Sequence, residues 1–455
     1  MSDLERGDIQ GLFARGYSNL PCAAFLVLRL EDHGREWLAA ALPAVTSSDD
    51  RPEQRAVNVA FSSGGLRRLG LDAESLGRFS NEFVTGMTTP HRRRLLADDG
   101  PSAPSGWDWG GPDTPEVDAA LLLYASDAQE LTRLEGEQVG LLRRHGVQVL
   151  RRLGTSDLDG IEPFGFRDGI SQPLVEGLGK TGPPQLTVKA GEFVLGYPNE
   201  YGLVTDHPPI GRNGSYLVFR QLEQDVHGFW RFLDAATRTG DGAEDPAARL
   251  RLAAKLVGRW PSGAPLALAP EADDPALAEE NDFRYHAEDV RGARCPVAAH
   301  IRRANPRDSL DPDPGTDDSF AVNRRHRILR RGREYGPSLA AEDALRSAHD
   351  GEARGLQFLC LNANIARQFE FVQHTWLNNA KFAGLYDDAD PLVGPSEPYG
   401  GTFTAPGEPL RERYTGVPRF VTVKGGAYFF MPGLAALGSL AGAGEPGNSS
   451  SPVGS

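Results

Sequence analysis

The sequence predicts an α+β fold made of two ferredoxin-like units, each a split βαβ arrangement with an antiparallel sheet. Two observations carry this prediction. From Ala23 to Leu153, β-rich apolar runs and amphipathic helical patterns follow one another as βαβ and then βαβ again. A similar order returns less clearly after Ser215. The smallest architecture that satisfies such an order is a split βαβ sheet with helices on one face.

Six elements are expected in the first half. Apolar and β-branched runs identify the strands, and apolar positions three and four residues apart identify the long helix. The elements are a strand at Ala23–Leu30, a helix at Glu36–Leu42, strands at Ala56–Ser62 and Ala119–Ala125, a helix at Ala128–His145 and a strand at Val147–Leu153.

The second half repeats these patterns around two irregular stretches, 180–213 and 258–320. Loops of that length inside a compact domain are usually functional. Pro246 stands where a first-turn proline begins a helix. The expected strands are Ser215–Leu222, Arg325–Arg330, Gly355–Asn362, Arg419–Val423 and Ala427–Met431, and the expected helices are Asp225–Ala236, Ala247–Val257 and Ile365–Asn379.

The 455 residues leave room for two or three domains. We expect an N-terminal ferredoxin-like domain over residues 1–190 and a C-terminal one over 191–433. Residues 434–455 are rich in Gly, Ser, Ala and Pro, which predicts a flexible tail. The apolar stretch Leu434–Leu440 leaves docking of this tail on a partner as the alternative.

Charge and composition exclude several classes of protein. The chain has 48 basic and 62 acidic residues, a net charge of −14, which argues against a nucleic-acid partner. The basic residues include only five lysines, and codon bias explains most of the arginine excess. No apolar run approaches the ~18 residues of a membrane span, and no targeting segment is visible, so we expect a cytoplasmic protein. Three scattered cysteines form no disulfide framework and no CxxC pair.

The segment Glu162–Pro173, EPFGFRDGISQP, is the first with chemical potential. Asp168 and Gly169 followed by Ser and Pro are typical of a turn, and a plain turn is one interpretation. In the functional interpretation, Gly165 and Gly169 let the backbone pass close to a flat ligand. The Asp168 carboxylate then points into a pocket as an acid/base group.

The segment Cys295–Arg307, CPVAAHIRRANPR, places His300 among small apolar residues. A structural histidine is one interpretation. Cys295 and His300 are too few for a tetrahedral zinc site, and they miss the C-x-x-C-H spacing of covalent haem attachment. A single imidazole is nevertheless enough to hold a non-covalent haem, because the porphyrin supplies four donors to the iron.

Two further segments complete the candidate site. In the basic run Arg324–Gly336, strand alternation sends Arg330 and Arg331 to opposite sides, so at least one points inward. Leu356 and Phe358 share one face of an expected strand. That face has two equal interpretations: it is an ordinary part of the hydrophobic core, or it is an apolar wall that keeps water away from a cofactor.

Together these four segments resemble the dye-decolorizing peroxidase family of haem enzymes, in the branch with the long fungal and actinobacterial members. The G-x-x-D-G element is Gly165–Gly169, and the iron-ligand segment is Cys295–His300. The resemblance covers nearly the whole chain and implies two ferredoxin-like domains with haem bound between them. Further matching motifs are Asp8–Gly11, Asn213–Arg220, Gln368–Gln373 and Asp390–Gly394.

The resemblance implies a haem peroxidase with one non-covalent haem b per chain. It would reduce hydrogen peroxide and oxidise dyes, phenols and similar aromatic donors through a ferryl intermediate. By similarity, His300 is the iron ligand and Asp390 is its hydrogen-bond partner, with 387 and 388 as neighbouring carboxylate positions. Asp168 would be the distal acid/base group, and Arg330 would stabilise the charge that develops on the peroxide. The sequence leaves the oligomeric state open.

The remaining positions follow from the same resemblance. Leu356 and Phe358 match the distal apolar wall, and Gly165 and Gly169 belong to the cofactor-binding loop. Trp376 matches a tryptophan that serves as a surface oxidation site in fungal relatives, and packing at a helix end is the alternative. Because an aspartate must carry the correct protonation for acid/base work, we expect an acidic optimum for turnover.

Two positions depart from the family pattern. Glu334 stands where relatives usually have Pro, and Gly332 stands where other branches have Asn, so proton delivery depends more on Asp168. A haem-binding or haem-handling protein with incidental peroxidase activity is the alternative function. A metal-dependent hydrolase using Asp168 and His300 lacks a second ligand cluster. The distal acid/base pair favours the enzyme, since a carrier needs none.

Overall fold

The structure is a computed structural model that describes residues 4–156, 160–179, 182–347, 349–396, 400–407 and 410–442. Within these residues, nine strands form a single sheet in which every strand pairing is antiparallel. The strands are β1 (Cys22–Arg29), β2 (Arg55–Phe61), β3 (Ala119–Ala125), β4 (Gln148–Gly154), β7 (Ser215–Gln224), β8 (Leu329–Arg330), β9 (Arg333–Tyr335), β10 (Gly355–Asn362) and β13 (Val421–Met431).

The sheet contains two ferredoxin-like halves. The order β4-β1-β3-β2, with helices α2 (Gly34–Ala41) and α7 (Ala128–Arg144) in the crossovers, is that of a split βαβ unit. The order β13-β7-β10-β8 repeats it in the second half, and β9 also pairs with β10. The predicted fold class is therefore confirmed. Phe61 of β2 pairs with Phe430 of β13, which joins the two expected sheets into one.

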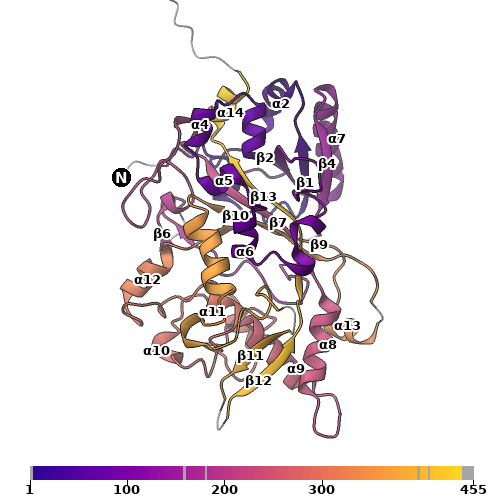
Figure 1. The fold of residues 1–455 in the computed structure, drawn as a ribbon, viewed down its shortest axis with the longest axis vertical. Coiled ribbons are helices and arrows are strands. Elements are labelled where there is room, and N and C mark those ends of the chain that lie inside the picture. Colours follow the sequence, from indigo (N-terminus) through magenta and orange to yellow (C-terminus); the bar gives the residue numbers. More distant parts are fainter. Residues whose placement is uncertain are drawn as a thin grey trace, which may run out of the picture.

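The inner faces of the two halves pack against each other. The rings of Phe25 on β1 and Phe219 on β7 lie 5.7 Å apart. Alternate residues of β1, such as Leu26 and Leu28, instead contact the helices α2 and α7 in a second core. Burial of both faces explains why β1 and β3 are almost continuously apolar. Figure 1 shows α2 and α7 at one end of the molecule and, at the other, α8 (Val226–Thr237), α9 (Pro246–Val257) and α13 (Ala341–Arg346).

Short helices account for most of what the sequence pattern missed. Four of them follow β2, each begun by a Ser, Asp or Thr side chain that accepts a backbone N–H. Helices of five to seven residues are too short to show a period. None of the described helices is long and apolar enough to cross a membrane. The remaining helices are α1 (Gly11–Ala14), α3 (Ser63–Arg68), α4 (Ala73–Gly77), α5 (Asn81–Thr85), α6 (Pro90–Leu96), α10 (His286–Asp289), α11 (His300–Ala304), α12 (Asp317–Arg324) and α14 (Leu434–Leu440).

Four expected elements differ from the structure in the second half. The strand expected from residue 325 is only the two-residue β8, because a turn at residues 325–326 follows the end of α12. The two closing strands are one, β13, interrupted by a bulge between Val423 and Gly425. The expected helix at Ile365–Asn379 is present as two short π-helical segments. Two small sheets complete the fold: β5 (Leu174–Val175) with β6 (Thr187–Val188), and β11 (Gly401–Ala405) with β12 (Glu412–Val417).

The segment predicted as a flexible tail begins with helix α14, which docks on the first half. Leu437 and Leu440 are buried in the core beside α2. The backbone carbonyl and the carboxylate of Asp8 accept the amides of Leu434 and Ala435 at 2.7 and 2.6 Å. The sequence-based alternative was docking on a partner, which stays a prediction, and the helix packs on its own chain. Residues 443–455 of the predicted tail lie outside the described residues, and the domain boundary at residue 190 stays a prediction.

Arg303 on α11 ties that helix to a distant segment of the chain. Its side chain is fully buried. The guanidinium donates to the backbone carbonyls of Trp376 at 2.9 Å, Asp388 at 2.8 Å, Leu377 at 3.3 Å and Asn379 at 2.5 Å. Burial lowers the pKa of Arg303 to about 10, which still leaves it charged at neutral pH. One cation therefore fixes the position of α11 relative to residues 376–388.

We expect Arg303→Met to lower the free energy of unfolding by about 3 kcal/mol, because several buried carbonyls lose their charged donor. Denaturant unfolding of the purified protein measures this change. Arg346→Met is the matched control, since Arg346 is 77% exposed and its ion pair with Glu342 contributes little. Equal midpoints for the two variants would contradict the role of Arg303.

Candidate active site

A cavity of about 300 Å³ lies against the outer face of β7, β10 and β13, opposite α11. Because side chains alternate along a strand, one set of positions on these strands faces the cavity, while their neighbours Leu217, Phe219 and Leu359 fill the inner core. The first 190 residues contribute the loop that contains Asp168. The apolar strand residues that line the cavity are Leu222, Leu356, Phe358, Val421 and Val423.

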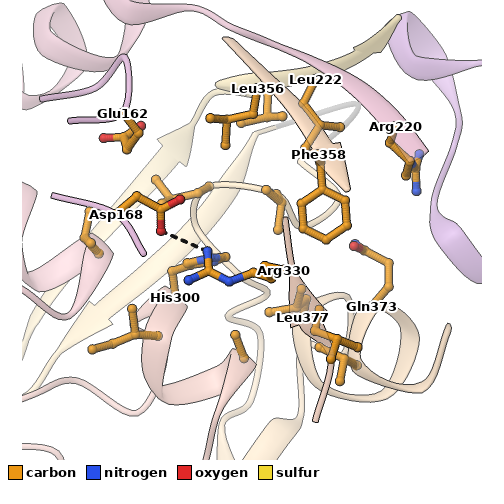
Figure 2. Close-up of a pocket in the computed structure, with 18 of the residues that line it drawn as sticks. Glu162, Asp168, Arg220, Leu222, His300, Arg330, Leu356, Phe358, Gln373 and Leu377 are labelled. Carbon is orange, nitrogen blue, oxygen red and sulfur yellow. Dashed lines mark hydrogen bonds and ion pairs between the residues drawn. The ribbon is translucent and has the colours of Figure 1, made fainter. Parts of the chain in front are cut away.

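Asp168 and Arg330 form an ion pair that opens into this cavity (Figure 2). The Arg330 Nη1 donates to Asp168 Oδ1 at 2.9 Å, and the two side chains are 32% and 35% exposed. Burial acts to raise the pKa of Asp168. The charge of Arg330 and the amide of Gly169 outweigh burial and hold that pKa below its ordinary value. Asp168 is thus an available base even in acidic solution.

Gly165 and Gly169 shape the loop of Asp168 without touching the cavity. Neither is among the described residues that line it. Their φ angles of +99° and +81° lie in the region that disfavours other residues. A Cβ at Gly169 would meet no atom within 4 Å. This conformation is a sufficient reason for glycine at both positions, and close approach to a ligand stays a prediction.

His300 begins helix α11 and faces the cavity. Its Nδ1 lies 2.9 Å from Oδ2 of the fully buried Asp390 side chain. The amides of Leu392 and Val393 both donate to Asp390 Oδ1 at 3.0 Å, which fixes this carboxylate. Burial acts to lower the pKa of His300, and Asp390 raises it above its ordinary value. Since Asp390 accepts the Nδ1 hydrogen, the lone pair of Nε2 is left for a ligand.

Of the three carboxylates near residue 390, Asp390 is the one that contacts His300. Asp387 pairs with Arg413, and Asp388 accepts from Thr402 at 2.7 Å. Figure 2 shows His300 on the opposite side of Arg330 from Leu356 and Phe358. Arg331, next in sequence to Arg330, points to the other face of the sheet and donates to the carbonyls of Leu12 and Phe13 at 2.7 Å. Alternation therefore sends both arginines inward, to opposite faces.

Arg327 places an unneutralised positive charge at the cavity. It lines the cavity and donates to the carbonyl of Ser171 at 2.7 Å. Among the described residues, no carboxylate lies within ion-pair distance of it. Burial, together with Arg307 and Arg330, lowers the pKa of Arg327 to about 9. A buried cation without a counter-charge favours an anionic group in the cavity.

Trp376 is buried rather than exposed. Only 4% of it is accessible, and its ring packs edge-on against His326 and Phe371 at 5.2 and 5.4 Å between centroids. The expected surface position is therefore wrong, and the alternative of packing at a helix end describes this side chain. Of its two ring neighbours, His326 lines the cavity.

Sequence reasoning missed Glu162, Gln224 and Arg327 as cavity residues. Glu162 heads the segment that contains Asp168, and its carboxylate accepts hydrogen bonds from Gln224 and two loop amides. Glu162 precedes the amides of Phe164 and Phe166 by two and four residues, and this spacing was the local signal for its role in the loop. Nothing local marks Gln224, because its partner lies 62 residues away.

The residues at the cavity fit a haem group. Haem needs one imidazole with a hydrogen-bonded partner, an apolar slot and positive charge for its carboxylates. The imidazole with its partner is His300 with Asp390. The apolar slot is formed by the strand residues around Leu356, and the positive charge is that of Arg327. Among the described residues, no group of three or more His, Cys, Asp and Glu side chains could hold a bare metal ion.

Comparison with known proteins gives one consistent result. No family model matches the chain. The dye-decolorizing peroxidase msp1 of Mycetinis scorodonius is 33% identical over 436 residues, which cover 90% of this chain and 79% of the relative. The multifunctional dye peroxidase DyP2 of an Amycolatopsis species is 36% identical over 406 residues, which cover 84% of this chain and 82% of the relative.

Solved structures agree with the sequence relatives. The crystal structure of a fungal DyP-type peroxidase from Auricularia auricula-judae aligns with a TM-score of 0.81 at 30% identity, covering 97% of this chain and 100% of the other. A second dye-decolorizing peroxidase, in complex with 2,6-dimethoxyphenol, aligns with a TM-score of 0.80 at 28% identity and covers 96% of this chain and 100% of the other. From this likeness over nearly the whole chain, we conclude that the protein belongs to the dye-decolorizing peroxidase family of haem enzymes.

Proposed function

We propose that this protein reduces hydrogen peroxide and oxidises small aromatic donors such as phenols and dyes, using one non-covalent haem b per chain. The observation that carries the proposal is that the Asp168–Arg330 ion pair and the His300–Asp390 pair face the same cavity. A haem carrier needs only the second pair. The first is an acid/base group beside a fixed charge, which favours an enzyme over a haem-handling protein.

His300 would hold the iron through Nε2, and Asp390 would strengthen that bond by accepting the Nδ1 hydrogen. Arg327 would neutralise a haem carboxylate. Leu356 and Phe358 would exclude water from the face of the haem that meets peroxide. When bound, haem supplies the iron that accepts oxidising equivalents from peroxide and passes them to the donor.

Asp168 would move the proton of the peroxide. Because Arg330 keeps its carboxylate ionised in acid, Asp168 can take the proton from one peroxide oxygen and return it to the other, so that water leaves. The guanidinium of Arg330 would stabilise the negative charge that develops as the O–O bond lengthens. The 2,6-dimethoxyphenol complex of a structural relative supports phenols as the donor class here.

We expect His300→Ala to fold but to lose the Soret band after addition of haem, because no other imidazole replaces its Nε2. Absorbance titration with haem measures this, and circular dichroism confirms the fold. His374→Ala, at an exposed position near the same cavity, is the control and should bind haem like the wild type. A normal Soret band in His300→Ala would show that the iron ligand is another residue.

We expect Asp168→Asn to slow the reaction with peroxide by about 10³-fold, within the range that general acid/base catalysis contributes. Stopped-flow mixing of the haem-loaded protein with peroxide measures this rate.

Arg330→Leu removes the charge that lowers the pKa of Asp168, so that pKa rises and the acid limb of the pH–rate profile moves to higher pH. Wild-type rates in Asp168→Asn, or an unmoved acid limb in Arg330→Leu, would contradict these roles.

A further inference from the structure

Glu162 is a second carboxyl group of the cavity, and neighbouring groups hold it in place. Gln224 Nε2 and the amide of Phe164 donate to its Oε2 at 2.8 and 3.1 Å, and the amide of Phe166 donates to its Oε1 at 3.0 Å. A carboxylate has about four lone-pair sites. Three are used here, so the fourth can take a proton without breaking the contacts that fix the group.

No cation neutralises Glu162 within the described part of the chain. Asp168, on the same loop, is the charged group that acts on it, and Gln224 contacts it from β7. Of the arginines that line the cavity, Arg259 and Arg327 donate to backbone carbonyls. The others have carboxylate partners: Arg167 with Glu279, Arg220 with Asp98, Arg330 with Asp168 and Arg419 with Asp99. Figure 2 shows Glu162 and Asp168 on the same side of the cavity.

The surroundings of the two carboxyl groups push their pKa values apart. Burial, together with the charge of Asp168, raises the pKa of Glu162 to about 7. Arg330 holds the pKa of Asp168 below its ordinary value. In mildly acidic solution Glu162 therefore carries a proton while Asp168 does not. Paired carboxyl groups whose pKa values differ in this way commonly divide the roles of acid and base.

We propose that Glu162 is a proton relay that supplies Asp168 from solvent during turnover. This inference rests on the proposed peroxidase function. Reduction of peroxide follows H₂O₂ + 2 H⁺ + 2 e⁻ → 2 H₂O, with both electrons coming from the aromatic donor. In each relay step the O–H bond of Glu162 breaks, an O–H bond forms on Asp168, directly or through one water, and Glu162 then takes a proton from solvent.

Glu334 on β9 provides a matched control. It is buried, with 8% exposed, and burial together with the charge of Asp168 raises its pKa to about 7. Glu334 is not among the described residues that line the cavity. Glu162 and Glu334 thus share residue type, pKa and electrostatic contact with Asp168, and they differ in access to the cavity.

The first test is the pH profile of kcat for the haem-loaded protein. The wild type should lose activity above pH 7 as Glu162 loses its proton. We expect Glu162→Gln to lower kcat by about 100-fold in acid, the low end of general acid catalysis, and to abolish the limb near pH 7. Glu162→Asp keeps a titratable group and should restore that limb in part. Glu334→Gln should keep the wild-type limb.

The second test needs no activity. Infrared difference spectra of the protein without haem, recorded at about pH 6 and pH 8, should show the C=O band of a protonated carboxyl group that is lost at the higher pH. Part of this band should come from Glu162. Glu334→Gln should retain that part, and Glu162→Gln should lack it. Absence of that difference would overturn the assignment of Glu162 as the group that titrates there.

The outcomes separate the relay from the proposed function. A wild-type protein that binds haem but does not turn over peroxide would refute the function. An active wild type whose pH limb survives in Glu162→Gln, with kcat lowered equally at every pH, would leave Glu162 only as a support of its loop and overturn the relay. Loss of the limb in Glu334→Gln would overturn it as well, because a group outside the cavity would then control the profile.

Discussion

The contact between Arg303 and the backbone carbonyls of residues 376–388 is the constraint on which the candidate site depends. His300 lies three residues before Arg303, and Asp390 lies two residues after Asp388. Because one rigid guanidinium holds both segments, the imidazole and its carboxylate partner are brought to 2.9 Å across 90 residues of chain. The backbone amides of residues 392 and 393 then orient that carboxylate, so the position of the His300 ring depends on backbone contacts as well as on its own helix.

Fully or partly buried positive charge recurs in this half of the molecule. Arg303, Arg327 and Arg331 are held by backbone carbonyls rather than by carboxylates. Burial lowers their pKa values to about 9 or 10, and a guanidinium stays protonated at those values. A lysine, whose pKa begins about two units lower and shifts readily on burial, would lose its charge in such places. Codon bias explains the total number of arginines. At these three positions, however, the structure requires arginine rather than lysine.

Much of the fold and part of the site could be predicted from the sequence. The bounds of β3 and β10 agree with prediction because β3 is uniformly apolar and β10 is apolar at most positions. Asp168, Arg330 and His300 carry local motifs, and the structure brings all three to one cavity. The exposure of Trp376 and the contacts of Glu162 depend on packing between distant segments. Local pattern contains no information about such packing, and helices of one or two turns are missed because they complete too little of a period.

The position of strand β13 late in the described chain bears on how the sheet assembles during synthesis. It pairs with β7 along most of its length and with β2 at Phe430, and its Val421 and Val423 line the cavity. Until these residues leave the ribosome, the edge of β7 is unpaired and the cavity lacks one wall. The cavity is therefore complete only when β13, the strand of this sheet that lies furthest along the described chain, has joined it.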